Sequence, residues 1–566
     1  MKIRESQFRI IIVIILVFTL FKAFGNALAH DHDDRYYTKA YVNALEKRIA
    51  ALEAKLQNLS VVRGSINGMP GPHLIITGAN LHVRNGGGKT ESINGLGNLI
   101  VGYNELRGRD DNRTGSHNIV VGKEHNYSSH GGLVAGRKNT ISGEFSCVSG
   151  GSLNNAFSNY SSILGGRGNT AGDNTDPNDH SIGVQATISG GYRNSTSGHY
   201  ASVSGGNENT ASGKYASVSG GRNNKASGDH SFVGGGGSSQ SSQGNEAFSN
   251  YSAVLGGQLN IAGDKNNQNM RHIGEFATVS GGFGNKANGS GSSVSGGYHN
   301  SASESYTSVS GGIRNFAKGP SSSVSGGDNN TASGQYSSVC GGHNNTASGN
   351  YSFIGGGGGP ESTNGNEAFS HYSAILGGRG NIAGNNRNPD EHTIGVGATV
   401  SGGSANFSRG DFSSVSGGAF NVAIGNASKV SGGRYNQASG DYSFVGGGGG
   451  EYDSNGNQAA AKYSAILGGQ MNVTDIGECS TVSGGFNNKA SGGYSSVSGG
   501  HTNHASNYYT TVSGGHENRA SNFHSSVSGG WNNEARAHWS TVSGGSSVTA
   551  DENYDTVVQY LVIKGP

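Results

Sequence analysis

The sequence predicts an all-β protein, built as a parallel β-roll or β-solenoid of 15-residue coils. The valine of the recurrent SVSGG motif, taken as a marker, falls at Val203, Val218 and Val233, and the same step returns from Val279 to Ile354. Gly-Gly follows the marker in most units and the apolar residues show no 3.6-residue period, which excludes helix. Only 32% of the 566 residues are hydrophobic and 102 are glycine, too little apolar material for large globular cores.

Composition also excludes a disordered chain, a nucleic-acid binder and a disulfide framework. A net charge of +1, with 13% charged residues, lacks the self-repulsion of disordered chains, and 24 Tyr with 19 Phe argue against disorder. The near-neutral charge also excludes the basic surface of a nucleic-acid binder. Cys147, Cys340 and Cys479 are widely spaced without CxxC pairs, so we expect no disulfide framework.

The N-terminal residues are typical of an export signal. Lys2, Arg4 and Arg9 precede the apolar run IIIVIILVFTLF, and small residues at 27–29 offer a cleavage site. The run has about 12 residues, against roughly 20 for a membrane helix. We therefore predict a signal peptide at 1–29, a polar tail at 30–41 and no stable membrane span after cleavage. An uncleaved N-terminal anchor is the alternative.

Residues 42–60 are predicted to form a short coiled coil. Apolar residues step 3, 4, 3, 4, 3 along a seam, as the a and d positions of a heptad do. The seam consists of Val42, Leu45, Ile49, Leu52, Leu56 and Leu59. Because it covers only about two and a half heptads, we expect it to set the register between chains instead of holding them together. A simple amphipathic helix is the alternative.

Each coil is predicted to contain two short strands. Alternation around the marker places Ala201 and Val203 on one face and Ser202 and Ser204 on the other. Glycines turn the chain, and a second strand, NENTAS, turns Asn209 and Ala211 inward. Residues 61–95 are expected to lead into these coils, which fill 96–545.

An asparagine follows the marker by six residues in most coils, for example at Asn194, Asn209, Asn224 and Asn285. Stacked in register, these amides are expected to form a hydrogen-bonded ladder. One Val and one Ala per coil bury little apolar area against the entropy of ordering 15 residues. The sequence therefore predicts further burial against partner chains.

The units ASVSGGNENTASGKY, SSVSGGDNNTASGQY and STVSGGFNNKASGGY resemble the head repeats of the trimeric autotransporter adhesins, the YadA-like family. The resemblance spans roughly residues 95–545. It implies a left-handed β-roll, a homotrimer and attachment at the surface of a bacterium. Most units have 15 residues, whereas those of the family are commonly one shorter. The C-terminal stretch DTVVQYLVIKGP differs from the family's membrane-anchoring segment, and we expect residues 546–566 to cap the last coil.

Two kinds of insertion interrupt the repeat, and we predict that they form recognition loops. The marker step lengthens to 21 before Val254, Ile375 and Ile466, and to 25 after Ile163, Val254 and Ile375. Loops on a rigid scaffold commonly carry recognition, although tolerated insertions are the alternative. The candidate residues are Asp173, Asp176, His180, Asn245, Glu246, Phe248, Arg271, His272, Asn366, Glu367, Phe369 and His392.

No metal, cofactor or catalytic residue is predicted. Asp173, Asp176 and His180 could belong to a metal-ligand set, but the sister loops replace much of it, for instance with Met270 and Asn388. The 37 acidic residues lie mostly in turns and loops, so no group of acids converges on a cleft as in polysaccharide-cleaving solenoids. We therefore do not expect an enzyme.

Aromatic residues recur three positions before the marker, at Tyr200, Tyr215, Tyr306, Phe276 and Trp539 among others. Such a column could stack on sugar rings or on a partner chain. We predict that the rings stack on one another and shield the turn.

The sequence as a whole indicates a secreted or surface-exposed adhesin. We expect an extracellular or cell-surface protein that attaches to host, matrix or neighbouring cells through a protein or glycan ligand. A periplasmic or N-terminally anchored location is the alternative. A passive structural filament is the functional alternative, since nothing in the ladder requires a ligand. An ice-binding surface, suggested by the repeated Ser-Val-Ser hydroxyls, is a third reading.

Overall fold

The computed structural model describes residues 39–173, 175–176, 179–240, 244–266, 270–388 and 391–558. It divides into two compact units, residues 1–86 and 87–566. The predicted signal peptide at 1–29 and most of the polar tail lie outside the described residues. The last residues of that tail, 39–41, begin the first helix.

In the first unit, helix α2 (Lys39–Leu56) precedes an antiparallel pair of strands, β1 (Leu59–Val62) and β2 (His73–Ile76). The predicted seam is helical from Val42 to Leu56, but its last member, Leu59, begins β1 and pairs with Ile76. The helix is therefore shorter than the expected 42–60 segment. No residue of α2 is buried, and the pairing of the seam with other chains stays a prediction.

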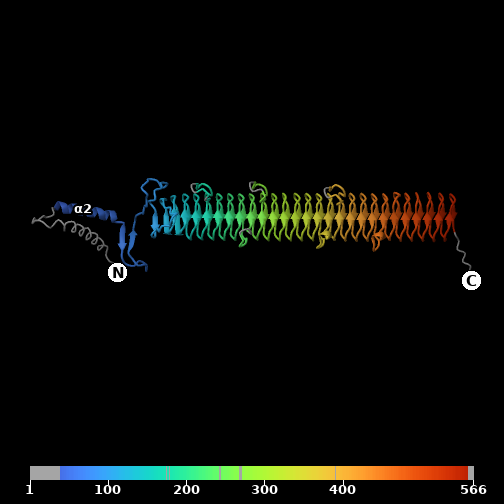
Figure 1. Cartoon of the computed structure of the whole chain (residues 1–566), viewed down its shortest axis with the longest axis horizontal. Coiled ribbons are helices and arrows are strands. Elements are labelled where there is room, and N and C mark those ends of the chain that lie inside the picture. The colour runs from blue at the N-terminus through green and yellow to red at the C-terminus, as the bar shows by residue number, and fades with distance from the viewer. Residues whose placement is uncertain are drawn as a thin grey trace. The chain divides into compact units, whose positions relative to one another are not determined.

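The second unit is a β-solenoid of two parallel sheets (Figure 1). The valine sheet contains β3 (Leu99–Val101), β4 (Ile119–Lys123), β6 (Leu133–Arg137) and the even-numbered strands from β8 (Cys147–Val148) to β56 (Thr556–Val557). The alanine sheet contains β5 (Asn126–Tyr127) and the odd-numbered strands from β7 (Thr140–Ile141) to β55 (Thr549–Ala550). From β7 onward each strand has two residues and pairs in register with the matching strand of the next coil, as Val203 does with Val218.

A central coil shows how the sequence pattern becomes a core. In β14 (Ser202–Val203) and β15 (Thr210–Ala211), Val203 and Ala211 are fully buried, whereas Ser202 faces outward. Asn209 is buried as well, as expected. Successive coils repeat this arrangement, so the core is a continuous column of Val or Ile beside a second column that is Ala in most coils. Thr196, Ser408 and Thr474 replace the alanine in three coils. The predicted strand faces and the parallel solenoid are confirmed.

The asparagine ladder uses backbone groups more than the expected contacts between amides. The Asn209 backbone N–H donates to Oδ1 of Asn194 at 3.0 Å, and Nδ2 of Asn209 donates to the carbonyls of Gly205 and Gly221, both at 2.9 Å. The side chain thereby joins its own coil to the next one, and the backbone N–H joins it to the coil before. Bonds between two amide side chains also occur, as from Asn330 to Asn315 at 3.2 Å, but in few coils.

Gly206 shows why the turn after the marker needs glycine. Its φ is +89°, in the left-handed region, and a Cβ there would lie 2.2 Å from the Gly221 carbonyl oxygen. A side chain at this corner would force the coils apart. Two independent constraints thus maintain the glycine.

The aromatic column lies at the other corner of the coil, where the backbone is also left-handed. Tyr200 and Tyr215 both have φ of 58°, and their rings stack with centroids 4.8 Å apart. The stack continues through His230, Tyr251 and Phe276. The prediction that these rings stack on one another is confirmed.

The two kinds of insertion lie on opposite edges of the solenoid (Figure 1). The long loops, residues 173–182, 264–273 and 385–394, follow an alanine-sheet strand and share the edge of the aromatic column. The short loops, residues 238–244, 359–365 and 450–456, follow a valine-sheet strand. Two of them contain a 3-10 turn, η1 (Ser362–Asn364) and η2 (Asp453–Asn455).

The coils continue past the expected boundary at residue 545. Strands β55 and β56 extend both sheets to Val557, so part of the segment predicted as a cap forms a further coil. Among the residues described, none of the helices has the length and apolar character needed to cross a bilayer.

Candidate functional site

Each long loop is closed at its base by one buried serine hydroxyl. In the first loop, Oγ of Ser158 accepts a hydrogen bond from the Asp173 backbone N–H at 3.1 Å and donates to the carbonyl of Ile182. The same pair of bonds holds the other two loops, with Ser249 between Asp264 and Ile273, and Ser370 between Asn385 and Ile394. The beginning and end of each loop are therefore fixed together.

Each long loop packs on a buried phenylalanine of the coil beneath it. The ring of Phe157 lies 4.6 Å from that of His180, and the ring of Phe369 lies 4.4 Å from that of His392. In the second loop, the guanidinium of Arg271 lies 5.8 Å from the centroid of the Phe248 ring. The carbonyls of His180, Arg271 and His392 also accept a backbone hydrogen bond from the coil beneath, at 2.9 to 3.0 Å.

The chain contains four similar modules, whose markers are Ile163, Val254, Ile375 and Ile466. The fourth module has neither the long loop nor the phenylalanine. The step after Ile466 is 16 residues instead of 25, so no long loop is inserted there. The position that carries phenylalanine in the other modules is Ala460. Phe248 and Phe369, predicted as recognition residues, are thus buried supports for the loops. Their occurrence only before long insertions was visible in the sequence.

Two acidic candidates contact the same loops from the alanine sheet. Glu246 is almost fully buried and forms ion pairs with Lys265 of the second long loop at 2.7 Å and with Lys225 at 3.6 Å. Glu367 accepts a hydrogen bond from Nδ2 of Asn386, in the third long loop, at 2.8 Å. Both carboxylates thereby fix the long loops to the sheet.

Asn245 and Asn366, which the sequence analysis placed in recognition loops, belong to the buried ladder. The Asn245 N–H donates to Asn224 Oδ1 at 3.0 Å, and Asn366 makes the matching bond to Asn345 at 2.9 Å. Neither side chain is available to a ligand, because both are buried and hydrogen-bonded. The ladder thus passes beneath the short loops without a break.

The remaining candidates lie at the surface of the long loops. Asp176 and His272 are exposed, whereas Asp173, His180, Arg271 and His392 are half-buried. These side chains differ among the three loops. The buried serine that holds the two ends of each loop, which we call the serine latch, is the same in all three. The scaffold therefore holds variable chemistry in a fixed position on one edge.

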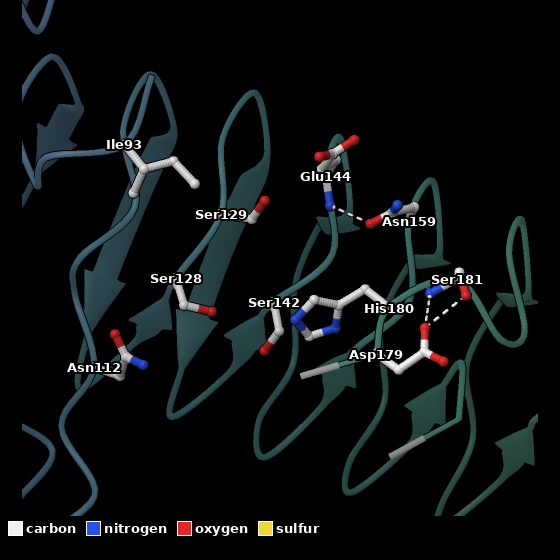
Figure 2. A pocket seen from close by; sticks show the side chains of 10 residues that line it. All are labelled: Ile93, Asn112, Ser128, Ser129, Ser142, Glu144, Asn159, Asp179, His180 and Ser181. Atoms are coloured by element: carbon white, nitrogen blue, oxygen red, sulfur yellow. Dashed lines mark hydrogen bonds between the residues drawn. The ribbon is translucent and has the colours of Figure 1, made fainter. Parts of the chain in front are cut away.

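Next to the first long loop lies a polar groove of about 550 Å³ (Figure 2). The His180 ring points toward Ser142, and the Asp179 carboxylate accepts hydrogen bonds from the backbone and hydroxyl of Ser181 at 2.9 and 2.6 Å. These bonds lower the pKa of Asp179, led by the one from the hydroxyl. The groove is lined by Ile93, Asn112, Ser128, Ser129, Ser142, Glu144, Asn159, Asp179, His180 and Ser181.

The third loop brings two histidines together. The rings of His371 and His392 lie 6.0 Å apart. Burial lowers the pKa of His371, and the neighbouring His392 lowers it further. Nδ1 of His371 accepts a hydrogen bond from the Asn350 backbone N–H at 3.0 Å, which requires an unprotonated nitrogen there.

Within the described residues, no group of three or more His, Cys, Asp or Glu side chains is arranged to hold a metal ion. The three cysteines are free thiols. Asp173 and Asp179 instead accept hydrogen bonds from the residues two positions further along the chain.

Comparison with known families gives one short match. Residues 480–492 match the model of the ubiquitous surface protein adhesin repeat. No curated protein matches the chain. Together with the solenoid, this match suggests an adhesin-type repeat at these residues.

Proposed function

We propose that this protein is a surface-exposed or secreted homotrimeric adhesin. The observation that carries the proposal is the set of three long loops, latched in the same way to a rigid solenoid but different in their outer residues. Such a combination suits recognition, because a rigid scaffold presents variable side chains at low entropic cost. The adhesin-repeat match supports the same function.

The homotrimer and the left-handed coil belong to this proposal, as does the location at a bacterial surface. Support comes from the small core, which is one column of Val or Ile and one of Ala along most of the solenoid. Packing between chains would bury additional surface. Sedimentation of the mature protein should give about three times the 57.6 kDa of the chain, less its signal peptide. A compact monomer would contradict the trimer.

Loop deletions test the function on each edge separately. One variant lacks residues 173–182, 264–273 and 385–394, which restores 15-residue steps on the edge of the long loops. A matched variant lacks residues 239–244, 360–365 and 451–456, which restores the same step on the opposite edge and keeps the ladder asparagines. Both should remain folded, because solenoid stability is mainly a nearest-neighbour sum.

The measurement is binding of the two variants and the intact protein to extracellular-matrix proteins and to cell surfaces, with circular dichroism as the folding control. We expect the variant without long loops to lose binding and the variant without short loops to keep it. The opposite result would move recognition to the other edge. If the intact protein binds no surface at all, the passive filament is the better account.

A further inference from the structure

The groove beside the first long loop contains serine hydroxyls that have no partner within the protein. Ser129 and Ser142 are each only 9% exposed, and both line the groove together with Ser128. The three hydroxyls form no hydrogen bond with the residues that the structure describes. Because native proteins rarely leave buried hydroxyls unpaired, we expect the groove to hold a partner for them.

The imidazole of His180 adds a further unpaired atom to the same groove. Its ring packs on Phe157, but its Nδ1 is buried and has no hydrogen-bond partner among the described residues. The ring points toward Ser142 (Figure 2). A neutral imidazole nitrogen and a serine hydroxyl can both accept a hydrogen bond. The buried side of the groove therefore offers several acceptors to a ligand that is rich in donors.

Two carboxylates border the groove, and no lysine or arginine lines it. Glu144 is exposed and Asp179 is half-buried. Neither carboxylate forms an ion pair with a lysine or arginine of the described chain. Both hydrogen bonds from Ser181 go to Oδ1 of Asp179, so Oδ2 is left for a ligand. The groove thus combines unpaired acceptors with uncompensated negative charge.

This pair of carboxylates is particular to the first long loop. The matching positions are Asp229 and Met270 at the second loop, and Asn350 and Glu391 at the third. The first loop also contains three aspartates and no Lys or Arg, whereas each of the other two loops contains Lys or Arg. The first loop is therefore the one whose charge suits a cationic ligand.

We propose that this groove binds a basic side chain, the ammonium of a lysine or the guanidinium of an arginine, presented by a protein ligand. Glu144 and Asp179 supply the negative charge, while the serine hydroxyls and Nδ1 of His180 accept the hydrogen bonds of the cation. Such charge-assisted hydrogen bonds are stronger than those between neutral groups. The inference rests on the proposed function, and it names the ligand chemistry of one long loop.

Two amides of the groove suit the peptide that carries the basic side chain. Asn112 and Asn159 line the groove, and their Nδ2 atoms donate no hydrogen bond to the described residues. They can therefore donate to the backbone carbonyls of a bound segment. Phosphate, sulfate and sialic acid groups are disfavoured, because the two carboxylates would repel them. A neutral glycan would satisfy the hydroxyls but leave both charges unpaired.

The test measures the binding of short peptides to the full-length protein by saturation-transfer NMR. The probes are acetylated Gly-Lys-Gly and Gly-Arg-Gly amides, with a norleucine peptide that keeps the lysine carbon chain but lacks the ammonium. We expect both basic peptides to bind and the norleucine peptide to bind at least tenfold more weakly. Binding should also weaken when NaCl is raised from about 0.05 to about 0.5 M, because salt screens the charges.

Charge-removing variants locate the cation. Glu144→Gln and Asp179→Asn should each weaken binding of the lysine peptide at least fivefold. Asparagine at 179 retains an oxygen for the two bonds from Ser181, so the loop should keep its geometry. Asp176→Asn is the matched control, because it removes the same charge from the same loop at a residue that does not line the groove. This control should bind like the parent.

A hydroxyl-removing variant separates ligand binding from stability. Because the Ser142 hydroxyl has no partner in the described protein, Ser142→Ala should leave the melting temperature unchanged. It should nevertheless weaken binding of the lysine peptide by about tenfold, since the cation loses one acceptor. A lower melting temperature with unchanged binding would assign the hydroxyl a structural role and contradict the proposed site.

Four other results would overturn the inference. Equal binding of the norleucine peptide would show that the cation is not recognised, and an equal loss with Asp176→Asn would show a general effect of charge. Binding of a neutral trisaccharide without binding of the basic peptides would assign the groove to a glycan. Binding of none of these probes would leave a groove filled by water only. If matrix binding still depends on the long loops in any of these cases, this inference fails and the proposed function stands.

Discussion

The imidazole of His392 lies 4.4 Å from the ring of Phe369, and its Nδ1 is 2.7 Å from the carbonyl oxygen of the same residue. Because a carbonyl only accepts, Nδ1 must carry a proton in this contact. One phenylalanine thus holds the third long loop through both its side chain and its backbone. The relationship explains how the last part of the third long loop is held against the coil beneath it.

The buried phenylalanines beneath the long loops should keep these loops structured. We expect Phe157→Ala, Phe248→Ala or Phe369→Ala to destabilise the corresponding loop by about 3 kcal/mol, the usual cost of removing a buried phenyl ring. Hydrogen exchange in that loop should become about a hundredfold faster. Ala460→Phe, in the module without a long loop, is the control and should change no exchange rate. Unchanged exchange after Phe369→Ala would show that the serine latch is sufficient.

The third long loop should loosen in acid, whereas the first two should not. His371 has a lowered folded pKa, so its contribution to stability is complete above the unfolded value of about 6.5 and is lost as the pH falls through the folded value. Protonation at Nδ1 breaks the bond from Asn350. Limited proteolysis at pH 7.5 and pH 5 should cut near residues 385–394 only at the lower pH.

The matched variant for this pH effect is His371→Asn. Asn159 and Asn250 occupy the same position in the first two modules, and Oδ1 of Asn159 accepts the corresponding backbone bond from Glu144 at 2.9 Å. The variant should therefore lose the pH dependence and keep the loop. Persistent acid sensitivity would show that His371 is not its source.

Removal of one ladder asparagine should lower the free energy of unfolding by the contribution of several hydrogen bonds. Asn209→Ala removes the acceptor for the Asn224 N–H and the donors to two glycine carbonyls. We expect a loss of about 2 to 4 kcal/mol, because buried backbone groups lose their partners. Thermal unfolding followed by circular dichroism measures it. Asn207→Ala, two residues earlier and outside the ladder, is the control and should lower the free energy of unfolding much less. Equal losses would show that the ladder does not stabilise the solenoid.

Chelation should leave the solenoid intact. Its coils are joined by backbone and asparagine hydrogen bonds, and no metal-ligand set recurs from coil to coil. The melting temperature should therefore be the same with and without EDTA. A large fall with the chelator would reveal a structural ion in the aspartate-containing turns.

The repeat made much of the fold predictable, because inward apolar and outward polar residues alternate in the same way in every coil. The inward Val203 and Ala211, the outward Ser202 and the stacked tyrosines all follow from position within the 15-residue unit. The partners of the asparagines did not follow, because Nδ2 of Asn209 reaches glycine carbonyls that exist only once the turn has formed. Residue type alone does not reveal such backbone acceptors.

The candidate site was less predictable than the scaffold. Its insertions were located correctly as departures from the repeat, but Asn245 and Phe248 proved to be scaffold residues beneath them. Side-chain burial depends on the path of the inserted chain, which periodicity does not contain.

The uniform contact between coils makes the distance between long loops a countable quantity. Markers from Ile163 to Val254 are five steps apart and those from Val254 to Ile375 are seven, about 24 and 34 Å at roughly 4.8 Å per step. Insertion or removal of one 15-residue coil would change either distance by a single step and leave every other contact as it was. A lineage could thus adjust the spacing of its loops to the spacing of receptors on a target surface by duplicating coils, without altering the loops themselves.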